Sequence, residues 1–150
     1  MEFNPSKCQV VRITTKREPT LTSYSIHGQI LEVACSAKYL GVHIDAKLNF
    51  NTHVDSICKK ANSTRAFLSR NFSRKIKEAC YNTYIRPIAE YAATVCDPYT
   101  IRNTKKIEQV QRSSARFVLN NYDRTSSYTT MLQNLQWPSL ECRRLQSRLQ

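Results

Sequence analysis

The acidic residues are the first place to look for chemistry, because enzymes that work through two metal ions need clustered carboxylates to hold them. The sequence has 150 residues and eleven Asp or Glu residues, all scattered singly, with no Asp-Asp or Asp-x-Asp pair. His43 and Asp45 together with His53 could imitate a metal site, but a fourth ligand is missing and the first two fit an exposed strand edge. The sequence therefore predicts no metal site and no complete active site.

The cysteines offer no better candidate for chemistry. Six are spread along the chain, and none forms a Cys-x-x-Cys pair, so a zinc site is not expected. We expect small, partly buried and reduced side chains, because the first residues carry no secretion signal. No Gly-x-Ser-x-Gly motif and no glycine loop for phosphate is present. No apolar run reaches the length of a membrane span, so the prediction is an intracellular chain, cytoplasmic or nuclear, with no membrane partner.

Charge is the strong signal of the sequence. The chain carries 23 Lys and Arg against 11 Asp and Glu, a net charge of +12. Residues 1–55 are nearly neutral, with 6 basic and 5 acidic residues, whereas residues 56–150 hold 17 basic and 6 acidic residues. Such a concentrated basic region predicts a nucleic-acid partner. The alternatives are a merely soluble basic face and attraction to anionic lipid.

The first fifty residues have the pattern of short β structure. Residues 10–15 are rich in β-branched side chains and predict a strand. A two-residue turn at His27-Gly28 predicts a hairpin that pairs Ile26 with Gln29, Tyr24 with Leu31 and Thr22 with Val33. Residues 39–45 predict a third β segment, with Leu40, Val42 and Ile44 facing inward and Gly41 inside the strand.

The remaining hundred residues have the pattern of helices. A helix is expected after a capping box at Thr52 and Asp55, with Val54, Ile57, Cys58, Ala61, Phe67 and Leu68 on its inner face. A second starts near residue 74 and ends at Asp97-Pro98, with inner residues Ile76, Cys80, Tyr84, Ile88, Tyr91 and Val95. Pro87 predicts a kink or break in it near Arg86. Further helices are expected over 103–121, with Ile107, Val110, Ser114, Phe117 and Val118 inside, over 126–136, and from Pro138 onward. The predicted fold class is α+β: short antiparallel β hairpins in residues 1–50, then a helical bundle in residues 51–150.

Basic residues are expected on the outer faces of these helices. They are Lys59, Lys60, Arg65, Arg70, Arg74, Lys75, Lys77, Arg86, Arg102, Lys105, Lys106, Arg112, Arg116, Arg143 and Arg144. A helical bundle with such a surface can follow a phosphate backbone, and nothing in the pattern reads bases. For any single one of these residues, a solvated surface charge remains the alternative.

Several motifs along the whole chain occur in the order known from one family of enzymes. They are Asn-Pro-Ser-Lys-Cys at 4–8, Ser-Ile-His-Gly-Gln at 25–29, Lys-Tyr-Leu-Gly-Val-His-Ile-Asp at 38–45, Ile-Arg-Pro-Ile-Ala-Glu-Tyr-Ala at 85–92, Ile-Glu-Gln-Val-Gln-Arg at 107–112 and Leu-Gln-Trp-Pro-Ser-Leu-Glu at 135–141. This ordered set resembles the end of the palm and the thumb of a non-LTR (LINE-type, jockey-like) retrotransposon reverse transcriptase, an RNA-directed DNA polymerase.

The resemblance implies roles for particular residues. Residues 39–42 (Tyr39, Leu40, Gly41 and Val42) resemble the primer grip, a β-hairpin that presses the primer's 3′ end toward the catalytic metals. A glycine there lets the backbone come close to the sugar-phosphate chain. Lys7 resembles, as a weak catalytic candidate, a lysine that protonates the leaving pyrophosphate. The helices resemble a thumb that holds an RNA/DNA template–primer by its phosphates, with these residues as candidates: Lys59, Lys60, Arg65, Arg70, Arg86, Lys105, Lys106, Arg112 and Arg116.

The resemblance also implies what the chain lacks. The catalytic aspartates of the palm would precede residue 1, and the fingers and the rest of the palm of the parent polymerase are missing as well. No cofactor is therefore expected in this fragment, and Mg²⁺ only in the full-length polymerase. Cys96 stands where the family usually has a tryptophan before Asp-Pro, and the loop 70–74 is short for the family.

The function expected from the sequence is that of a polymerase fragment that grips primer and template–primer hybrid and is catalytically incomplete alone. Two alternatives stay open. One is a stand-alone basic nucleic-acid-binding module, and the other is a non-functional translated relic whose front strands have lost their partners.

Overall fold

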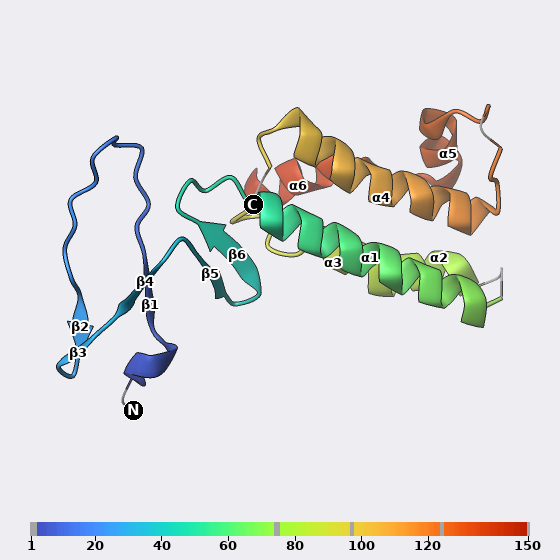
Figure 1. Cartoon of the computed structure of the whole chain (residues 1–150). Coiled ribbons are helices and arrows are strands. Elements are labelled where there is room, and N and C mark those ends of the chain that lie inside the picture. Colours follow the sequence, from blue (N-terminus) through green and yellow to red (C-terminus); the bar gives the residue numbers. More distant parts are fainter. Residues whose placement is uncertain (1–2, 74–75, 97, 124, 150) are drawn as a thin grey trace. The chain divides into compact units, whose positions relative to one another are not determined.

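The computed structural model describes residues 3–73, 76–96, 98–123 and 125–149 (Figure 1). The chain is mixed α+β, mostly helical with a few short strands. It divides into two compact units, Met1–Phe50 and Asn51–Gln150. The division falls where the sequence changes from β-branched segments to helical stripes. Within the described residues, no helix combines the length and apolar character needed to cross a membrane.

The first unit consists of three small two-stranded sheets. A 3₁₀ turn, η1, precedes strands β1 to β6: Pro5–Lys7, then Gln9–Val11, Ser25–Ile26, Gln29–Ile30, Glu32–Ala34, Ser36–Tyr39 and Val42–Asp45. Strand β2 pairs with β3, and β5 with β6, both antiparallel. Strand β1 pairs with β4 in parallel, which the prediction of antiparallel hairpins alone did not foresee.

The hairpin at His27-Gly28 forms with the predicted turn. His27 and Gly28 have φ angles of 51° and 78°, the left-handed geometry that two-residue hairpin turns require. Ile26 pairs with Gln29 as predicted, and the Leu31 amide donates to the Tyr24 carbonyl at 2.8 Å. The prediction that Thr22 pairs with Val33 is wrong, because Val33 lies opposite Val10 in the parallel ladder.

Gly41 lies in a hairpin turn, so the expectation of a glycine inside a strand is wrong. Strands β5 and β6 end at Tyr39 and begin again at Val42, and these two residues face each other across the ladder. Leu40 and Gly41 form the turn with φ angles of 46° and 82°. Alternation of apolar side chains continues through a tight turn, which is why periodicity alone read this segment as one strand.

The first unit has almost no apolar core of its own. Among its described residues, Val42 is the one buried apolar side chain. Large apolar side chains are exposed instead, among them Phe3, Ile13, Leu21, Tyr24, Ile30, Val33 and Leu48. Folding costs about 1–2 kcal/mol of backbone conformational entropy for each ordered residue. The small apolar surface buried in this unit offsets little of that cost.

The second unit is a helical bundle. Its elements are α1 (Asn51–Asn71), α2 (Lys77–Cys80), the π-helix η3 (Tyr81–Ile85), α3 (Arg86–Glu90), α4 (Ile101–Leu119), α5 (Tyr128–Leu135) and α6 (Leu140–Leu149). Helix α1 packs against α4 and against the α2–η3–α3 segment, and α4 also contacts α5 and α6 (Figure 1). Because α1 begins at Asn51, Thr52 lies in its first turn and does not form the predicted cap.

Two apolar clusters form the core of the bundle. One contains Ala61, Leu68, Cys80, Tyr81, Ile85, Val110 and Phe117, and the other contains Val54, Ile57, Ala89, Ile107 and Leu140. The inner faces predicted for α1 and α4 supply most of both clusters. Phe67 is an exception, because it is 61% exposed.

The inner stripe predicted for the second helix is only partly correct: Cys80 is buried and Ile88 packs against the core, but its other members are exposed. Tyr84, Tyr91 and Val95 are exposed, whereas Tyr81, Ile85 and Ala89 are buried. Before Pro87 the cause is the π-helix η3, in which the Arg86 amide donates to the Tyr81 carbonyl, five residues back. A wider turn rotates the residues around it relative to a regular α-helix. After Pro87 the helix ends at Glu90, so Tyr91 and Val95 lie in the turn that follows it. The predicted disturbance near Arg86 is therefore present as a π-helical turn directly before Pro87.

The segment 136–141 is held against η3 and α4 by residues of the 107–112 and 135–141 motifs, for which the sequence predicted no mutual contact. Trp137 stacks on Tyr81 with ring centroids 3.9 Å apart. Gln111 donates to the Pro138 carbonyl at 2.8 Å and accepts from the Leu140 amide at 3.0 Å. Glu108 accepts from the Glu141 amide at 2.8 Å. Side chains of α4 thus satisfy amides at the start of α6 that have no partner inside that helix.

No disulfide joins any of the six cysteines, all of which the structure describes. Burial raises the pKa of the Cys58 thiol to about 11, and the negative charge of nearby Asp55 adds to this increase.

Because the thiolate is the nucleophile, Cys58 should react with iodoacetamide at pH 8 on the order of 100-fold more slowly than exposed Cys35 and Cys142. Peptide mass spectrometry after timed alkylation checks this. Equal rates in the native chain would contradict it, and unfolding in guanidinium should equalise them.

Candidate nucleic-acid interface

Helix α4 carries a line of basic side chains on the side opposite its buried face. Arg102, Lys105, Arg112 and Arg116 follow one another at steps of three, seven and four residues, which places them on one face of a helix. Arg102 and Lys105 are exposed, and Arg112 and Arg116 are partly exposed. The line spans about 21 Å at 1.5 Å per residue. We call these four residues the α4 stripe.

The single acidic residue of α4 is turned away from the α4 stripe. Glu108 accepts hydrogen bonds from the Tyr128 hydroxyl and the Glu141 amide, both at 2.8 Å. Burial, together with the bond to Glu108, raises the pKa of the Tyr128 hydroxyl above its ordinary value. Arg112 lies with its guanidinium 5.9 Å from the centre of the Tyr128 ring. Glu108 therefore binds residues of α5 and α6 and does not neutralise the cations of the α4 stripe.

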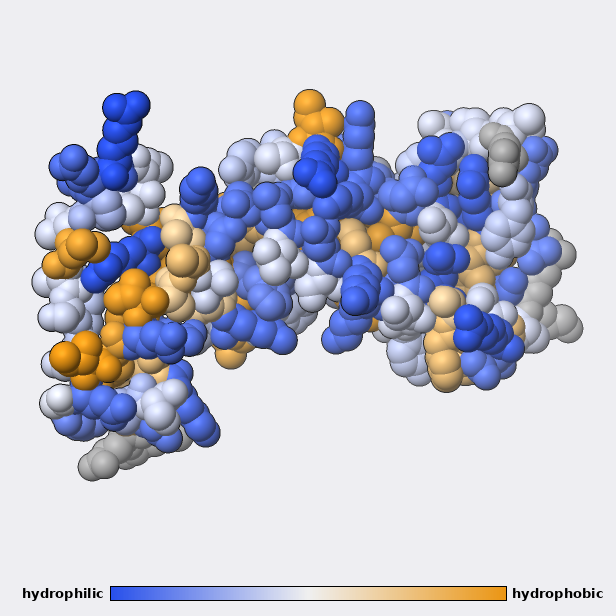
Figure 2. All heavy atoms as spheres, in the orientation of Figure 1, coloured by the Kyte–Doolittle hydropathy of each residue, from blue (hydrophilic) through white to orange (hydrophobic). Residues whose placement is uncertain are grey.

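Helix α1 adds basic residues beside this line. Lys59 and Arg70 are exposed and lie eleven positions apart, so they share the outer face of α1 about 16 Å from each other. Lys60 is exposed on a flank, and Arg65 is partly buried. On the face seen in Figure 2, the surface over α1 and α4 is mostly hydrophilic. Helices α1 and α4 pack side by side. A nucleic-acid backbone that lies along α4 would therefore also be within reach of cations on α1.

Three predicted surface cations take part in contacts inside the bundle. Lys106 forms an ion pair with Asp55, which joins α4 to α1. Arg86 donates to the Asn82 side chain at 3.0 Å and lies 3.9 Å from Glu90, and Arg143 also pairs with Glu90. The Glu90 bond raises the pKa of Arg143 further. Lys106 and Arg86 stay partly exposed, but part of their charge is already compensated.

Two other cations do not lie on the outer faces, and the expectation for them is wrong. Arg144 is 3% exposed, and its guanidinium donates to the backbone carbonyls of Ala89 and Cys96. Lys77 is 9% exposed and lies 4.8 Å over the centre of the Phe117 ring. Helical periodicity predicted both on the outside because it carries no information about contacts with other segments. A long basic side chain can reach backbone carbonyls or an aromatic ring elsewhere in the bundle. The predictions for Arg74 and Lys75 lie outside the described residues.

The tip of the β5–β6 hairpin presents apolar side chains to solvent. Tyr39 is 67% exposed and Leu40 is 74% exposed, whereas Val42 is 7% exposed. The expectation that Val42 packs inward is confirmed, and the same expectation for Leu40 is wrong. Gly41 is exposed at the tip, so a backbone without a side chain is available there. Leu40 in the left-handed region costs about 1–2 kcal/mol relative to its ordinary backbone geometry.

Replacing Leu40 should change the stability of the β5–β6 hairpin and the binding of a primer end in opposite directions. In the Leu40→Asn variant, the left-handed turn is better tolerated, so hydrogen exchange of the β5–β6 amides should slow by several-fold. If Leu40 contacts the end of a primer, the same variant should bind that end more weakly. Faster exchange in this variant would contradict the turn geometry. The matched control is Leu48→Asn, which also sits at positive φ outside the hairpin.

The remaining predicted residues do not assemble into a chemical site. Lys7 is exposed at the end of η1. Asp45 accepts from the amides of Lys47 and Asn49 at 3.0 and 3.1 Å, so it organises the turn after β6. His43 belongs to β6, and His53 is buried in α1. Among the described residues, no group of three or more His, Cys, Asp or Glu side chains could hold a metal ion.

Comparison with known proteins adds no relative. No family model matches the chain, no curated protein matches it, and no solved structure matches it.

Proposed function

We propose that the chain grips a nucleic-acid template–primer as part of an RNA-directed DNA polymerase of the non-LTR retrotransposon type. The α4 stripe with Lys59, Lys60 and Arg70 would hold phosphates, and the β5–β6 tip would contact the primer's 3′ end. The observation that carries the proposal is the α4 stripe, in which the cations share one face and the acid of the same helix is engaged elsewhere. Phosphate contacts of this kind position a duplex without reading its sequence.

The chemistry of the β5–β6 tip suits contact with the end of a duplex better than contact with the phosphates along its side. Tyr39 and Leu40 expose apolar surface, and Gly41 exposes bare backbone. An apolar tip fits against a terminal base pair, and the glycine allows the sugar-phosphate chain to approach. The family resemblance of this segment to a primer grip agrees with that chemistry.

The proposed role is binding without catalysis by this chain alone. The carboxylates that would hold two metal ions belong, by the resemblance, to a palm that precedes this segment. Mg²⁺ is therefore a partner of the whole polymerase, together with its fingers and the rest of its palm. The site of action would be inside the cell, in the cytoplasm or the nucleus.

Fluorescence anisotropy with a labelled RNA–DNA hybrid tests the binding function. If about five phosphates are neutralised, the log of the affinity should fall with the log of the salt concentration with a slope of roughly −4. A slope near zero, or no binding by chain shown to be folded by circular dichroism, would contradict the proposal. Nucleotide incorporation by the pure chain with Mg²⁺ would contradict the claim that it is catalytically incomplete.

A second candidate function is a stand-alone basic nucleic-acid-binding module. It is favoured by the bundle Asn51–Gln150, which contains both apolar clusters and the α4 stripe. This function predicts salt-dependent binding of hybrid and DNA duplex alike, with no contribution from Tyr39 or Leu40. A non-functional relic predicts a chain that aggregates through its front strands and binds neither.

A further inference from the structure

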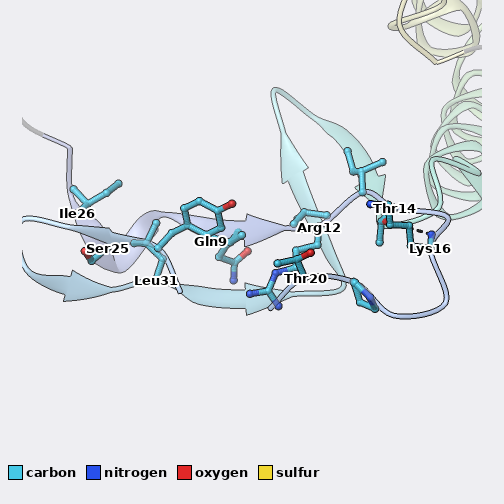
Figure 3. Close-up of a pocket in the computed structure, with 13 residues that line it drawn as sticks. Gln9, Arg12, Thr14, Lys16, Thr20, Ser25, Ile26 and Leu31 are labelled. Atoms are coloured by element: carbon cyan, nitrogen blue, oxygen red, sulfur yellow. Dashed lines mark hydrogen bonds between the residues drawn. The ribbon is translucent and has the colours of Figure 1, made fainter. Parts of the chain in front are cut away.

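The first unit contains a hollow that the proposed nucleic-acid contacts do not use. It has a volume of about 760 Å³ and lies between two arms of the chain, residues 9–16 and 19–26 (Figure 3). The arms rise from β1 and return to β2 through the bend near residues 16–19 (Figure 1). We call this hollow the arm slot.

The backbone of the two arms is available for pairing. Strand β1 ends at Val11 and β2 begins at Ser25, and the residues between them belong to no strand. In the described part of the chain, no backbone hydrogen bond joins residues 13–16 to residues 19–23. The arms are linked by the Arg12 guanidinium, which donates to the Thr22 carbonyl at 2.5 Å. Backbone that is not paired in a ladder can accept a further strand.

The side chains of the arm slot are mixed apolar and basic. Val10, Ile13, Tyr24, Ile26 and Leu31 line it, with Ile13 and Tyr24 more than half exposed. The charged lining residues are Arg12 and Lys16, and no carboxylate is among the lining residues. An occupant with apolar and acidic side chains would complement this surface.

We propose that the arm slot receives an extended polypeptide strand with apolar side chains alternating with acidic ones. The strand would pair with backbone of one or both arms, cover Ile13 and Tyr24, and place carboxylates near Arg12 and Lys16. Strands commonly run five or six residues, and the first arm offers six, residues 9–14, of which Gln9–Val11 already pair with β4 along one edge. Such a strand also supplies burial that the first unit lacks, since Val42 is its one buried apolar side chain among the described residues.

The residues of the arm slot are not among those proposed to contact nucleic acid, so occupation of the slot is independent of that function. A peptide probe therefore tests it separately, with the full 150-residue chain. The probe is a blocked seven-residue peptide of alternating valine and glutamate with valine at both ends. One matched control replaces glutamate by lysine, and the other carries N-methyl groups on every valine, which blocks one hydrogen-bonding edge.

Hydrogen–deuterium exchange read by mass spectrometry gives the result. The glutamate peptide should slow exchange across residues 9–24 by at least ten-fold, and both control peptides should have little effect. Arg12→Gln combined with Lys16→Gln should weaken binding of the glutamate peptide by about ten-fold, since each charge contact contributes modestly. The control variant is Arg17→Gln with Lys47→Gln, because these cations do not line the arm slot. It should bind like the unchanged chain.

Four results would overturn the proposal. The first is unchanged exchange across residues 9–24 with the glutamate peptide. The second is equal protection by the glutamate and lysine peptides. The third is protection that rises with protein concentration without peptide, together with dimers in sedimentation, which would show that a second copy fills the arm slot. The fourth is protection of the same residues by RNA–DNA hybrid alone.

Discussion

Replacing Arg144 by alanine should lower the free energy of unfolding of the helical bundle by about 3 kcal/mol, since the variant leaves buried carbonyls without a charged donor. Arg144 is 3% exposed and donates to the Ala89 carbonyl at 2.9 Å and to the Cys96 carbonyl. The bonds tie α6 to the end of α3 and to the buried Cys96. Urea denaturation followed by circular dichroism measures the loss.

Two further variants make this prediction specific. Arg148→Ala removes the same side chain from an exposed position on the same helix, so it should change stability by less than about 0.5 kcal/mol. Arg144→Met keeps much of the side-chain volume but supplies no hydrogen-bond donor. This variant should therefore still be much less stable than the unchanged chain. Equal stability of the Arg144→Ala and Arg148→Ala variants would show that the carbonyl contacts contribute little.

If each cation of the α4 stripe contacts one phosphate, replacing three of the four should weaken binding of an RNA–DNA hybrid on the order of 100-fold at 0.1 M salt. The variant is Lys105→Gln, Arg112→Gln and Arg116→Gln together. The slope of log affinity against log salt should become shallower by about 2.7, at about 0.9 for each phosphate. Anisotropy titrations at several salt concentrations measure both quantities.

The control for the α4 stripe changes the same net charge elsewhere. Arg17→Gln, Lys47→Gln and Arg148→Gln are exposed positions outside the stripe. This variant should lose only a few-fold in affinity, through the lower net charge. Equal losses in the two triple variants would mean that overall charge, not the arrangement on α4, determines binding.

The regular helices were predictable from the sequence because their apolar residues recur at helical spacing. Ile107, Val110 and Phe117 are buried as the pattern of α4 predicts, and Val54, Ile57 and Ala61 are buried as the pattern of α1 predicts. The stripe before Pro87 was not predictable in register. A π-helical turn depends on how a segment packs, and a period of 3.6 residues does not encode it.

The candidate site was predictable only in its charge. Composition and spacing indicate basic outer faces, but they do not distinguish Arg112 on the surface from Arg144 in the core. The difference arises because Arg144 meets carbonyls at the end of α3, a contact between residues more than fifty positions apart in sequence. The β5–β6 tip was identified by its glycine, yet the exposure of Leu40 followed only from the turn geometry.

Titration with duplexes that differ in their ends tests most directly whether the chain grips a primer. Folded chain would be titrated into three labelled duplexes of equal length: a hybrid with a recessed primer end, a blunt hybrid and a blunt DNA duplex, each at two salt concentrations. If the chain grips a primer, we expect the tightest binding to the recessed hybrid, a steep salt dependence for all three duplexes, and loss of the preference in the Leu40→Asn variant. Equal affinity for the three duplexes would contradict a primer-gripping role and leave a generic basic module.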